Sequence, residues 1–155
     1  MENMEIERKW KIRRIPDDLS RYTCHTMEQA YLSVSPTVRI RREDGIFYLT
    51  YKGTGDNDIA HTEYNLPLTK QSYDHLMEKH DGIIIKKKRY VIPISDTDLN
   101  IELDIFDPPY EGLIIAEVEF PSVEMAKEFN EPDWFLEDVT HDPKYKNSSL
   151  AMNAD

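Results

Sequence analysis

Ionisable side chains recur two residues apart along this chain, with apolar residues between and around them. In residues 5–14 the odd positions are all charged, whereas Ile6, Trp10 and Ile12 occupy even positions. Successive side chains of a β-strand point to opposite faces, so this spacing predicts strands with one charged and one largely apolar face. The same pattern returns in several later segments, and it constrains the fold more than any other feature.

Eight segments read as strands separated by turn signals. They are residues 5–14, 26–33, 37–42, 45–53, 60–68, 83–94, 99–106 and 113–120. Residues 69–80 are predicted to form a helix with Thr69 as N-cap, and Ser122 caps a second, shorter one. Short segments follow Pro16 and Pro132, residues 53–58 form a polar loop, and the chain ends in a tail rich in Asp, Lys and Asn. Many short strands favour a closed antiparallel sheet over a parallel α/β fold. We therefore expect an α+β, mainly β fold: an eight-stranded antiparallel β-barrel with short helices packed outside.

The length of 155 residues suits one domain, and no Gly-, Pro- or Ser-rich stretch reads as a linker, so residues 1–155 are predicted to be a single domain. Apolar runs are far shorter than the roughly 20 residues of a membrane helix, and the N-terminus lacks a signal-peptide pattern. A soluble cytoplasmic protein without membrane contact is expected. Cys24 is the only cysteine, which excludes an internal disulfide, and it reads as a small core residue sooner than as a nucleophile.

The net charge of −11 disfavours a nucleic-acid partner. The acidity is concentrated at one end, because residues 96–155 hold three Lys and Arg against sixteen Asp and Glu. Such an acidic end is either a solvated surface that aids solubility or a set that includes carboxylates for divalent cations. The positions of these carboxylates within the predicted strands must distinguish a solvated surface from a cation site.

The charged faces pair like charges at two-residue spacing. The pairs are Glu5 with Glu7, Arg39 with Arg41, Lys87 with Arg89, Glu102 with Asp104, and Glu117 with Glu119, and Lys9, Lys52 and Glu63 are further members. For any one strand, the commoner explanation of a charged face is that it is the solvent-exposed face of a half-buried sheet. The set of strands as a whole favours a binding site instead, because adjacent like charges repel unless a counter-ion lies between them. A divalent cation would relieve the glutamate pairs and a multiply charged anion the basic pairs, and a metal-bound polyphosphate supplies both.

Glu5-x-Glu7-x-Lys9 resembles the signature of the CYTH superfamily, the triphosphate tunnel metalloenzymes. Further segments are similar to family segments in family order, over almost the whole chain: residues 29–32, 37–41, 48–53, 87–90, 112–119 and 145–150. The resemblance implies an eight-stranded tunnel whose lumen binds a triphosphate through basic side chains, with Mg²⁺ or Mn²⁺ held by glutamates.

The resemblance also implies roles for individual residues. Glu5, Glu7 and Glu119 become metal ligands, with Glu63 and Glu117 as nearby ligands or support. The triphosphate clamp would be Lys9, Arg39, Arg41, Lys52, Lys87 and Arg89. The catalytic set combines Glu5, Glu7 and Glu119 with Lys9, Arg39, Arg41 and Lys87. Glu102 and Asp104 fit the lumen, but their contact with metal is left open.

Two positions depart from the family pattern. Asn65 stands where the family often has a second glutamate, and His61 stands where a basic residue is common. Both departures bear on metal stoichiometry or substrate preference. Taken alone, His61 reads as an ordinary surface histidine near a loop.

The expected function is metal-dependent hydrolysis of the terminal phosphate of tripolyphosphate or a nucleoside triphosphate, because the chain shows no insertion for reading a base. Alternatives within the fold are a CYTH-type adenylate cyclase and a thiamine triphosphatase. An alternative from another class is a non-catalytic polyphosphate or nucleotide sensor, against which the four glutamates in two like-charged pairs argue. The partner is thus a triphosphate-containing small molecule, and the sequence leaves a homodimer open.

Overall fold

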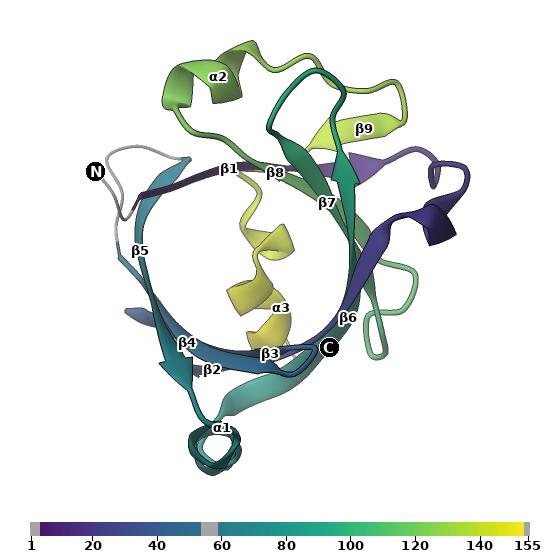
Figure 1. Ribbon diagram of the computed structural model, residues 1–155. Coiled ribbons are helices and arrows are strands. Elements are labelled where there is room, and N and C mark those ends of the chain that lie inside the picture. The colour runs from purple at the N-terminus through teal and green to yellow at the C-terminus, as the bar shows by residue number, and fades with distance from the viewer. Residues whose placement is uncertain (1–3, 54–58, 154–155) are drawn as a thin grey trace.

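The computed structural model of the protein describes residues 4–53 and 59–153. In these residues nine strands form one antiparallel sheet in the order β5-β4-β3-β2-β6-β7-β8-β1-β9, and β5 also pairs with β1. The pairing of β5 with β1 closes eight strands into a barrel, and β9 lies outside it (Figure 1). The predicted eight-stranded antiparallel barrel is confirmed.

The barrel strands follow the predicted segments closely. They are β1 (Met4–Ile12), β2 (Thr23–Ser33), β3 (Thr37–Glu43), β4 (Ile46–Lys52), β5 (Ala60–Leu68), β6 (Asp81–Pro93), β7 (Asn100–Phe106) and β8 (Ile114–Glu119). The other elements are α1 (Lys70–Met77), α2 (Val123–Glu128), β9 (Phe135–Asp138), α3 (Asn147–Met152) and two 3₁₀ turns, Leu19–Arg21 and Pro143–Tyr145. Residues 54–58 of the predicted polar loop lie outside the described residues.

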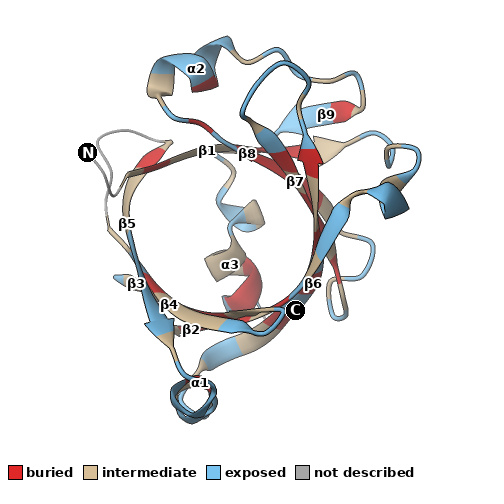
Figure 2. Cartoon of the chain, viewed as in Figure 1, coloured by how far each residue is buried: buried red, intermediate tan, exposed pale blue. Residues whose placement is uncertain are grey.

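The charged faces of the strands point into the barrel and the apolar faces point outward. The largest apolar core lies on the outer wall, where Trp10, Leu103 and Val118 pack beneath α2 and β9. The rings of Trp10 and Phe135 are 4.7 Å apart between centroids. Figure 2 shows the buried residues along these strand walls, with the solvent-facing sides of α1 and α2 exposed. The barrel therefore keeps its polar side chains in the lumen.

Helix α1 closes the opposite outer face. The Thr69 hydroxyl accepts a hydrogen bond from the Ser72 backbone N–H, which confirms Thr69 as the N-cap. Tyr73 is buried against Ala30 and Ile40 of the barrel wall. The predicted cap of the second helix is confirmed as well, because the Ser122 hydroxyl accepts a hydrogen bond from the Met125 backbone N–H.

Two features of the C-terminal third were not predicted. Residues 135–138 form strand β9, which extends the sheet beyond β1, where the sequence suggested only a short segment. Helix α3 does not pack outside, because it lies within the circle of strands and covers one end of the lumen (Figure 1). Its Leu150 and Ala151 pack on lumen residues Tyr31, Ile85 and Phe106, and this apolar end explains why α3 is buried there.

Two local features fix the position of α3. Gly82 has a φ of +69°, and a Cβ there would lie 2.2 Å from the Ala151 carbonyl oxygen, so only glycine permits this approach. The Tyr110 hydroxyl donates to the Leu150 carbonyl. Neither contact is visible from the composition of the tail, which is why the sequence did not reveal a helix in this position.

Cys24 is exposed on β2, so its predicted place in the core is wrong. Within the described parts of the chain, no helix has the length and apolar character needed to cross a membrane.

Candidate active site

The lumen contains a polar cavity of about 380 Å³, which we call the first cavity. Strands β1, β3, β4, β5, β6, β7 and β8 supply almost all of its lining, because the alternation along each strand turns its charged residues inward. The lining residues are Glu5, Glu7, Arg39, Arg41, Glu43, Tyr48, Lys52, Glu63, Asn65, Arg89, Glu102, Glu117, Glu119 and Asn147. Ten of the thirteen side chains predicted for the site are thus gathered around one space.

Two buried guanidinium groups in the first cavity have only neutral partners among the described residues. Arg39 is 5% exposed and donates only to the Thr50 hydroxyl, at 3.3 Å, and its Nε is buried without a partner. Arg41 is 6% exposed and donates to the Gln29 amide oxygen at 2.7 Å and to the Tyr48 hydroxyl at 3.4 Å. Burial and the like charges of Arg39 and Arg89 lower the pKa of Arg41. A buried cation without a counter-ion is costly, so this pair is arranged for an anion from outside the chain.

Two carboxylates of the first cavity are also without a cationic partner. Glu7 and Glu119 lie directly opposite each other on β1 and β8, and neither side-chain carboxylate makes an ion pair or hydrogen bond with another described residue. Burial, followed by the charges of Glu5 and Glu117, raises the pKa of Glu7. Loss of hydration on the cavity side, followed by the charge of Glu5, raises the pKa of Glu119 to about 7. These carboxylates repel each other and would be stabilised by a cation.

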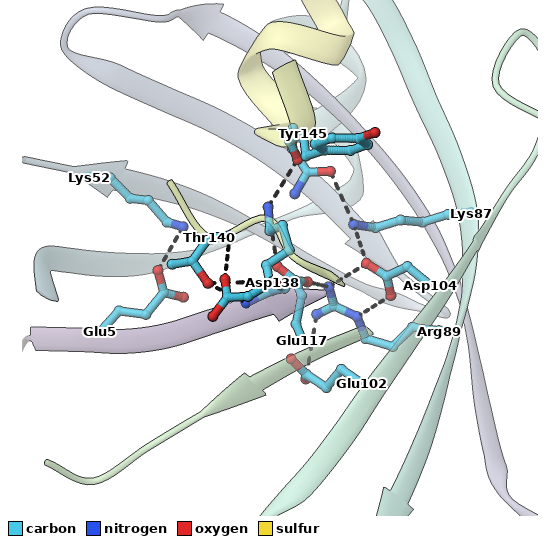
Figure 3. Close-up of polar contacts among 12 residues, drawn as sticks. Glu5, Lys52, Lys87, Arg89, Glu102, Asp104, Glu117, Asp138, Thr140 and Tyr145 are labelled. Atoms are coloured by element: carbon cyan, nitrogen blue, oxygen red, sulfur yellow. Dashed lines mark hydrogen bonds and ion pairs between the residues drawn. The ribbon is translucent and has the colours of Figure 1, made fainter. Parts of the chain in front are cut away.

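The remaining charged groups are largely neutralised within the protein (Figure 3). The Lys52 ammonium lies 2.7 Å from Glu5 and 3.9 Å from Glu63. Arg89 donates to both oxygens of Asp104, at 2.7 and 2.8 Å, and to Glu117 at 2.8 Å. The positive charges of Lys9 and Arg89 outweigh the burial of Glu117 and hold its pKa well below the ordinary range. Glu117 is therefore an ionised counter-ion for basic side chains.

Lys87 and Asp104 do not line the first cavity. Lys87 is completely buried, and its ammonium lies 2.7 Å from Asp104 and 3.4 Å from the side-chain oxygen of Asn147. Burial lowers the pKa of Lys87 to about 7, although the charge of Asp104 acts in the opposite direction. In this structure both residues support Arg89 and the α3 end of the lumen.

A second cavity of about 380 Å³ adjoins the first. It shares Glu7, Arg39, Lys52 and Asn147 with the first cavity, and segment 140–149 forms one of its walls. Lys9, predicted for the triphosphate clamp, lines this second cavity, where its ammonium donates to the Tyr145 carbonyl and lies 3.6 Å from Glu117. The lumen therefore has two compartments separated by a few shared side chains.

His61 and Asn65, the two departures from the family pattern, lie in different compartments. His61 is half-buried and lines the second cavity. The Asn65 amide donates to Glu63 at 3.2 Å and accepts from the Thr50 hydroxyl, which in turn accepts from Arg39. Asn65 is thus a neutral residue that links Glu63 to the Thr50 hydroxyl at this edge of the first cavity.

Some residues that line the first cavity or accept hydrogen bonds from its arginines were not predicted. Tyr48 and Thr50 precede Lys52 by four and two positions on β4, so the alternation that identified Lys52 could also have identified them. Gln29 alternates with Tyr31 on β2 in the same way. Asn147 had no such signal, because it comes from a segment without strand periodicity.

The carboxylates match the ligands that divalent Mg²⁺ or Mn²⁺ prefers, since both bind hard oxygen donors. Among the described residues, no three His, Cys, Asp or Glu side chains converge closely enough to hold a metal ion by themselves. Mg²⁺ commonly binds through one or two carboxylates, waters and substrate phosphate oxygens, so a complete protein cage is not required. Glu7 and Glu119, repelling each other and without ion-pair partners, fit such a site.

Comparison with known proteins gives a consistent result. No family model matches the sequence. The chain is 33% identical over 153 residues to a Nitrosomonas europaea protein named inorganic triphosphatase, and the match covers 96% of this chain and 97% of that protein. It is 36% identical over 120 residues to an Acetivibrio thermocellus protein of the same name, covering 76% and 72%.

The fold is shared with solved structures as well. A crystal structure described as an inorganic triphosphatase superposes with a TM-score of 0.70 at 30% identity, covering 96% of this chain and 95% of that one. Identity above 30% over nearly the full length of both chains, together with the closed barrel and its charged lumen, shows the family. The chain belongs to the CYTH superfamily of triphosphate tunnel enzymes, together with relatives named inorganic triphosphatase.

Proposed function

We propose that this protein hydrolyses the terminal phosphoric anhydride bond of inorganic tripolyphosphate in the first cavity, with the help of a divalent cation. The observation that carries the proposal is the presence, in one cavity, of two buried arginines without carboxylate partners and two carboxylates without cationic partners. A metal-bound triphosphate supplies the missing charge of both signs. The names of the relatives support the same reaction.

Arg39 and Arg41 bind the phosphate oxygens of the substrate. A guanidinium can hold a phosphate group through two parallel N–H bonds, and the fixed positions of these side chains on β3 orient the terminal phosphorus for attack. Lys52 and Arg89 add positive charge at the two sides of the cavity. The position of the cavity inside the barrel, away from bulk water, strengthens these interactions as negative charge moves to the leaving group.

Glu5, Glu7 and Glu119 would hold Mg²⁺ or Mn²⁺ together with substrate oxygens. When bound, the cation supplies neutralising charge on the phosphate oxygens during transfer. Glu117 is proposed to act as counter-ion to Lys9 and Arg89, and Glu63 and Glu102 as support at the rim. Lys87 and Asp104 are proposed to hold Arg89 in position.

In the reaction, a water oxygen forms a bond to the terminal phosphorus, and the bond from that phosphorus to the bridging oxygen breaks. The electron pair of the broken bond leaves on pyrophosphate, and the two water protons are divided between pyrophosphate and orthophosphate. No covalent enzyme intermediate is needed.

The lining favours an inorganic substrate over a nucleotide. Tyr48 is the only aromatic residue among the fourteen that line the first cavity, and none is aliphatic. A nucleobase or a thiazolium ring would find little apolar surface on which to stack.

Phosphorus NMR tests the proposal. Purified protein is incubated with tripolyphosphate, ATP or thiamine triphosphate, each with Mg²⁺, Mn²⁺ or EDTA. The proposal predicts equimolar orthophosphate and pyrophosphate from tripolyphosphate, only with metal, and slower turnover of the organic substrates. Cyclic AMP and pyrophosphate from ATP would instead identify a cyclase, and binding without products would identify a sensor.

A further inference from the structure

The second cavity differs in charge from the first. Among the described residues that line it, Glu7 is the only carboxylate, whereas Lys9, Arg39, Lys52 and Lys146 are cationic. The first cavity is lined by seven carboxylates and four cations. A metal-bound phosphate suits the mixed lining of the first cavity, and a metal-free anion suits the second.

The unpaired cations of the second cavity match the charge of a small dianion. Lys9 and Lys52 are neutralised by Glu117 and Glu5, at 3.6 and 2.7 Å. Arg39 and Lys146 make no ion pair with a described residue, and the Nε of Arg39 is buried without a hydrogen-bond partner. Two uncompensated positive charges therefore border this space.

Hydroxyl groups add neutral hydrogen-bonding capacity to the same wall. The Ser148 and Ser149 hydroxyls line the second cavity, and neither makes a hydrogen bond with another described residue. Seated by Gly82 and Tyr110, α3 carries these serines on a fixed backbone. Oriented hydroxyls and a lysine ammonium are common donors to phosphate oxygens.

The position of the second cavity relates it to the reaction. Arg39 and Asn147 line both cavities, so an ion that leaves the terminal-phosphate position past Arg39 enters the second cavity without crossing the strand wall. We propose that the second cavity is a separate binding site for inorganic orthophosphate, which the released terminal phosphate occupies while pyrophosphate remains in the first cavity. The assignment as a product site rests on the proposed function; the assignment as an orthophosphate site does not.

A pair of variants separates the two cavities by equilibrium binding. Isothermal titration of metal-free protein in EDTA measures the affinities for orthophosphate and tripolyphosphate. Lys146→Gln removes a cation that lines only the second cavity, and Arg41→Ala removes one that lines only the first. Lys144→Gln is the matched control, because Lys144 is an exposed lysine of the same segment that lines neither cavity.

Lys146→Gln is expected to weaken orthophosphate binding about fivefold, a moderate loss because Lys146 is exposed and solvent screens its charge. Lys144→Gln should leave this affinity unchanged. Arg41→Ala should weaken tripolyphosphate binding with little effect on orthophosphate. The proposal is overturned if wild-type protein binds no orthophosphate at millimolar concentration, if Lys146→Gln behaves like Lys144→Gln, or if Arg41→Ala weakens both ligands equally.

Steady-state kinetics of the intact enzyme test the product role separately. With Mg²⁺ present, orthophosphate should inhibit tripolyphosphate hydrolysis non-competitively, and Lys146→Gln should relieve this inhibition. Strictly competitive inhibition would place orthophosphate in the first cavity and overturn the proposal. If the protein hydrolyses nothing yet the binding pattern holds, the orthophosphate site stands and both its product role and the proposed function fall.

Discussion

The two cavities share Glu7, Arg39, Lys52 and Asn147, yet they differ in how their other walls are built and charged. The first cavity is enclosed mainly by barrel strands, whose alternation supplies carboxylates and basic groups at close range. Segment 140–149 forms one wall of the second cavity. It contributes hydroxyls and a lysine but no carboxylate to the lining. The comparison teaches that carboxylate content, seven residues against one among the described lining, distinguishes the proposed site for a metal-bound anion from the proposed site for a bare one.

The largest expected effect comes from replacing Glu7, one of the two carboxylates of the first cavity without a cationic partner. Glu7→Gln should lower kcat for tripolyphosphate by at least about 100-fold, comparable to the loss of one electrostatic contact with a transition state. The fold should persist, and the melting temperature of metal-free protein should rise, because Glu7 is repelled by Glu5 and Glu117. Glu124→Gln on α2 is the control. Wild-type turnover in Glu7→Gln would remove Glu7 from the metal site.

The next effect concerns the arginines without carboxylate partners. Arg41→Ala should weaken tripolyphosphate binding in Mg²⁺ by about 1.5–3 kcal/mol for each charge-assisted bond lost, or roughly ten- to 100-fold. Titration calorimetry measures this change. Arg42→Ala is the matched control, because Arg42 is the next residue on β3 and alternation turns it to the outer face. Equal affinities in the two variants would show that Arg41 does not contact the substrate.

The wall that α3 contributes to the second cavity depends on Gly82. Gly82→Ala should displace α3 and destabilise the protein by about 1–3 kcal/mol, because the new Cβ meets the Ala151 carbonyl at a positive φ. Denaturant unfolding gives the stability, and hydrogen exchange of residues 147–152 reports the displacement. Gly45→Ala meets no atom within 4 Å and serves as the control. If α3 exchanges equally slowly in both variants, Gly82 does not determine its seating.

The smallest expected effect is a pH dependence of stability in metal-free protein. The pKa of Glu119 is raised from 4.5 to about 7 in the folded state, so its favourable contribution is complete below pH 4.5 and is lost as the pH rises through 7. Thermal unfolding should therefore show a melting temperature that falls between these values. Mg²⁺ and Glu119→Gln should each flatten the decline. A slope that neither change alters would contradict the repulsion among the carboxylates.

Much of the barrel and first cavity could be predicted, because both depend on a local rule. Charged residues two apart, such as Arg39 with Arg41, must share a face of a strand, and antiparallel closure brings those faces together. The pairing partners that leave Arg41 without a carboxylate, Gln29 and Tyr48, depend on register between strands far apart in sequence. They could not be derived from spacing within one strand.

The second cavity was beyond prediction for a different physical reason. Its distinctive wall depends on α3 entering the barrel, which requires the absence of a side chain at Gly82 and the hydroxyl of Tyr110. These contacts join residues separated by 40 or more positions, and the tail itself carries no periodic pattern. The tail therefore read as an irregular segment.

The most direct test of the central claim is a crystal structure of Glu7→Gln with tripolyphosphate and Mn²⁺, in which slow turnover preserves the substrate. We predict that tripolyphosphate lies in the first cavity with its non-bridging oxygens on Arg39 and Arg41, and that anomalous scattering locates Mn²⁺ beside Glu5 or Glu119. Tripolyphosphate bound only elsewhere, with both guanidinium groups free of phosphate, would contradict the account.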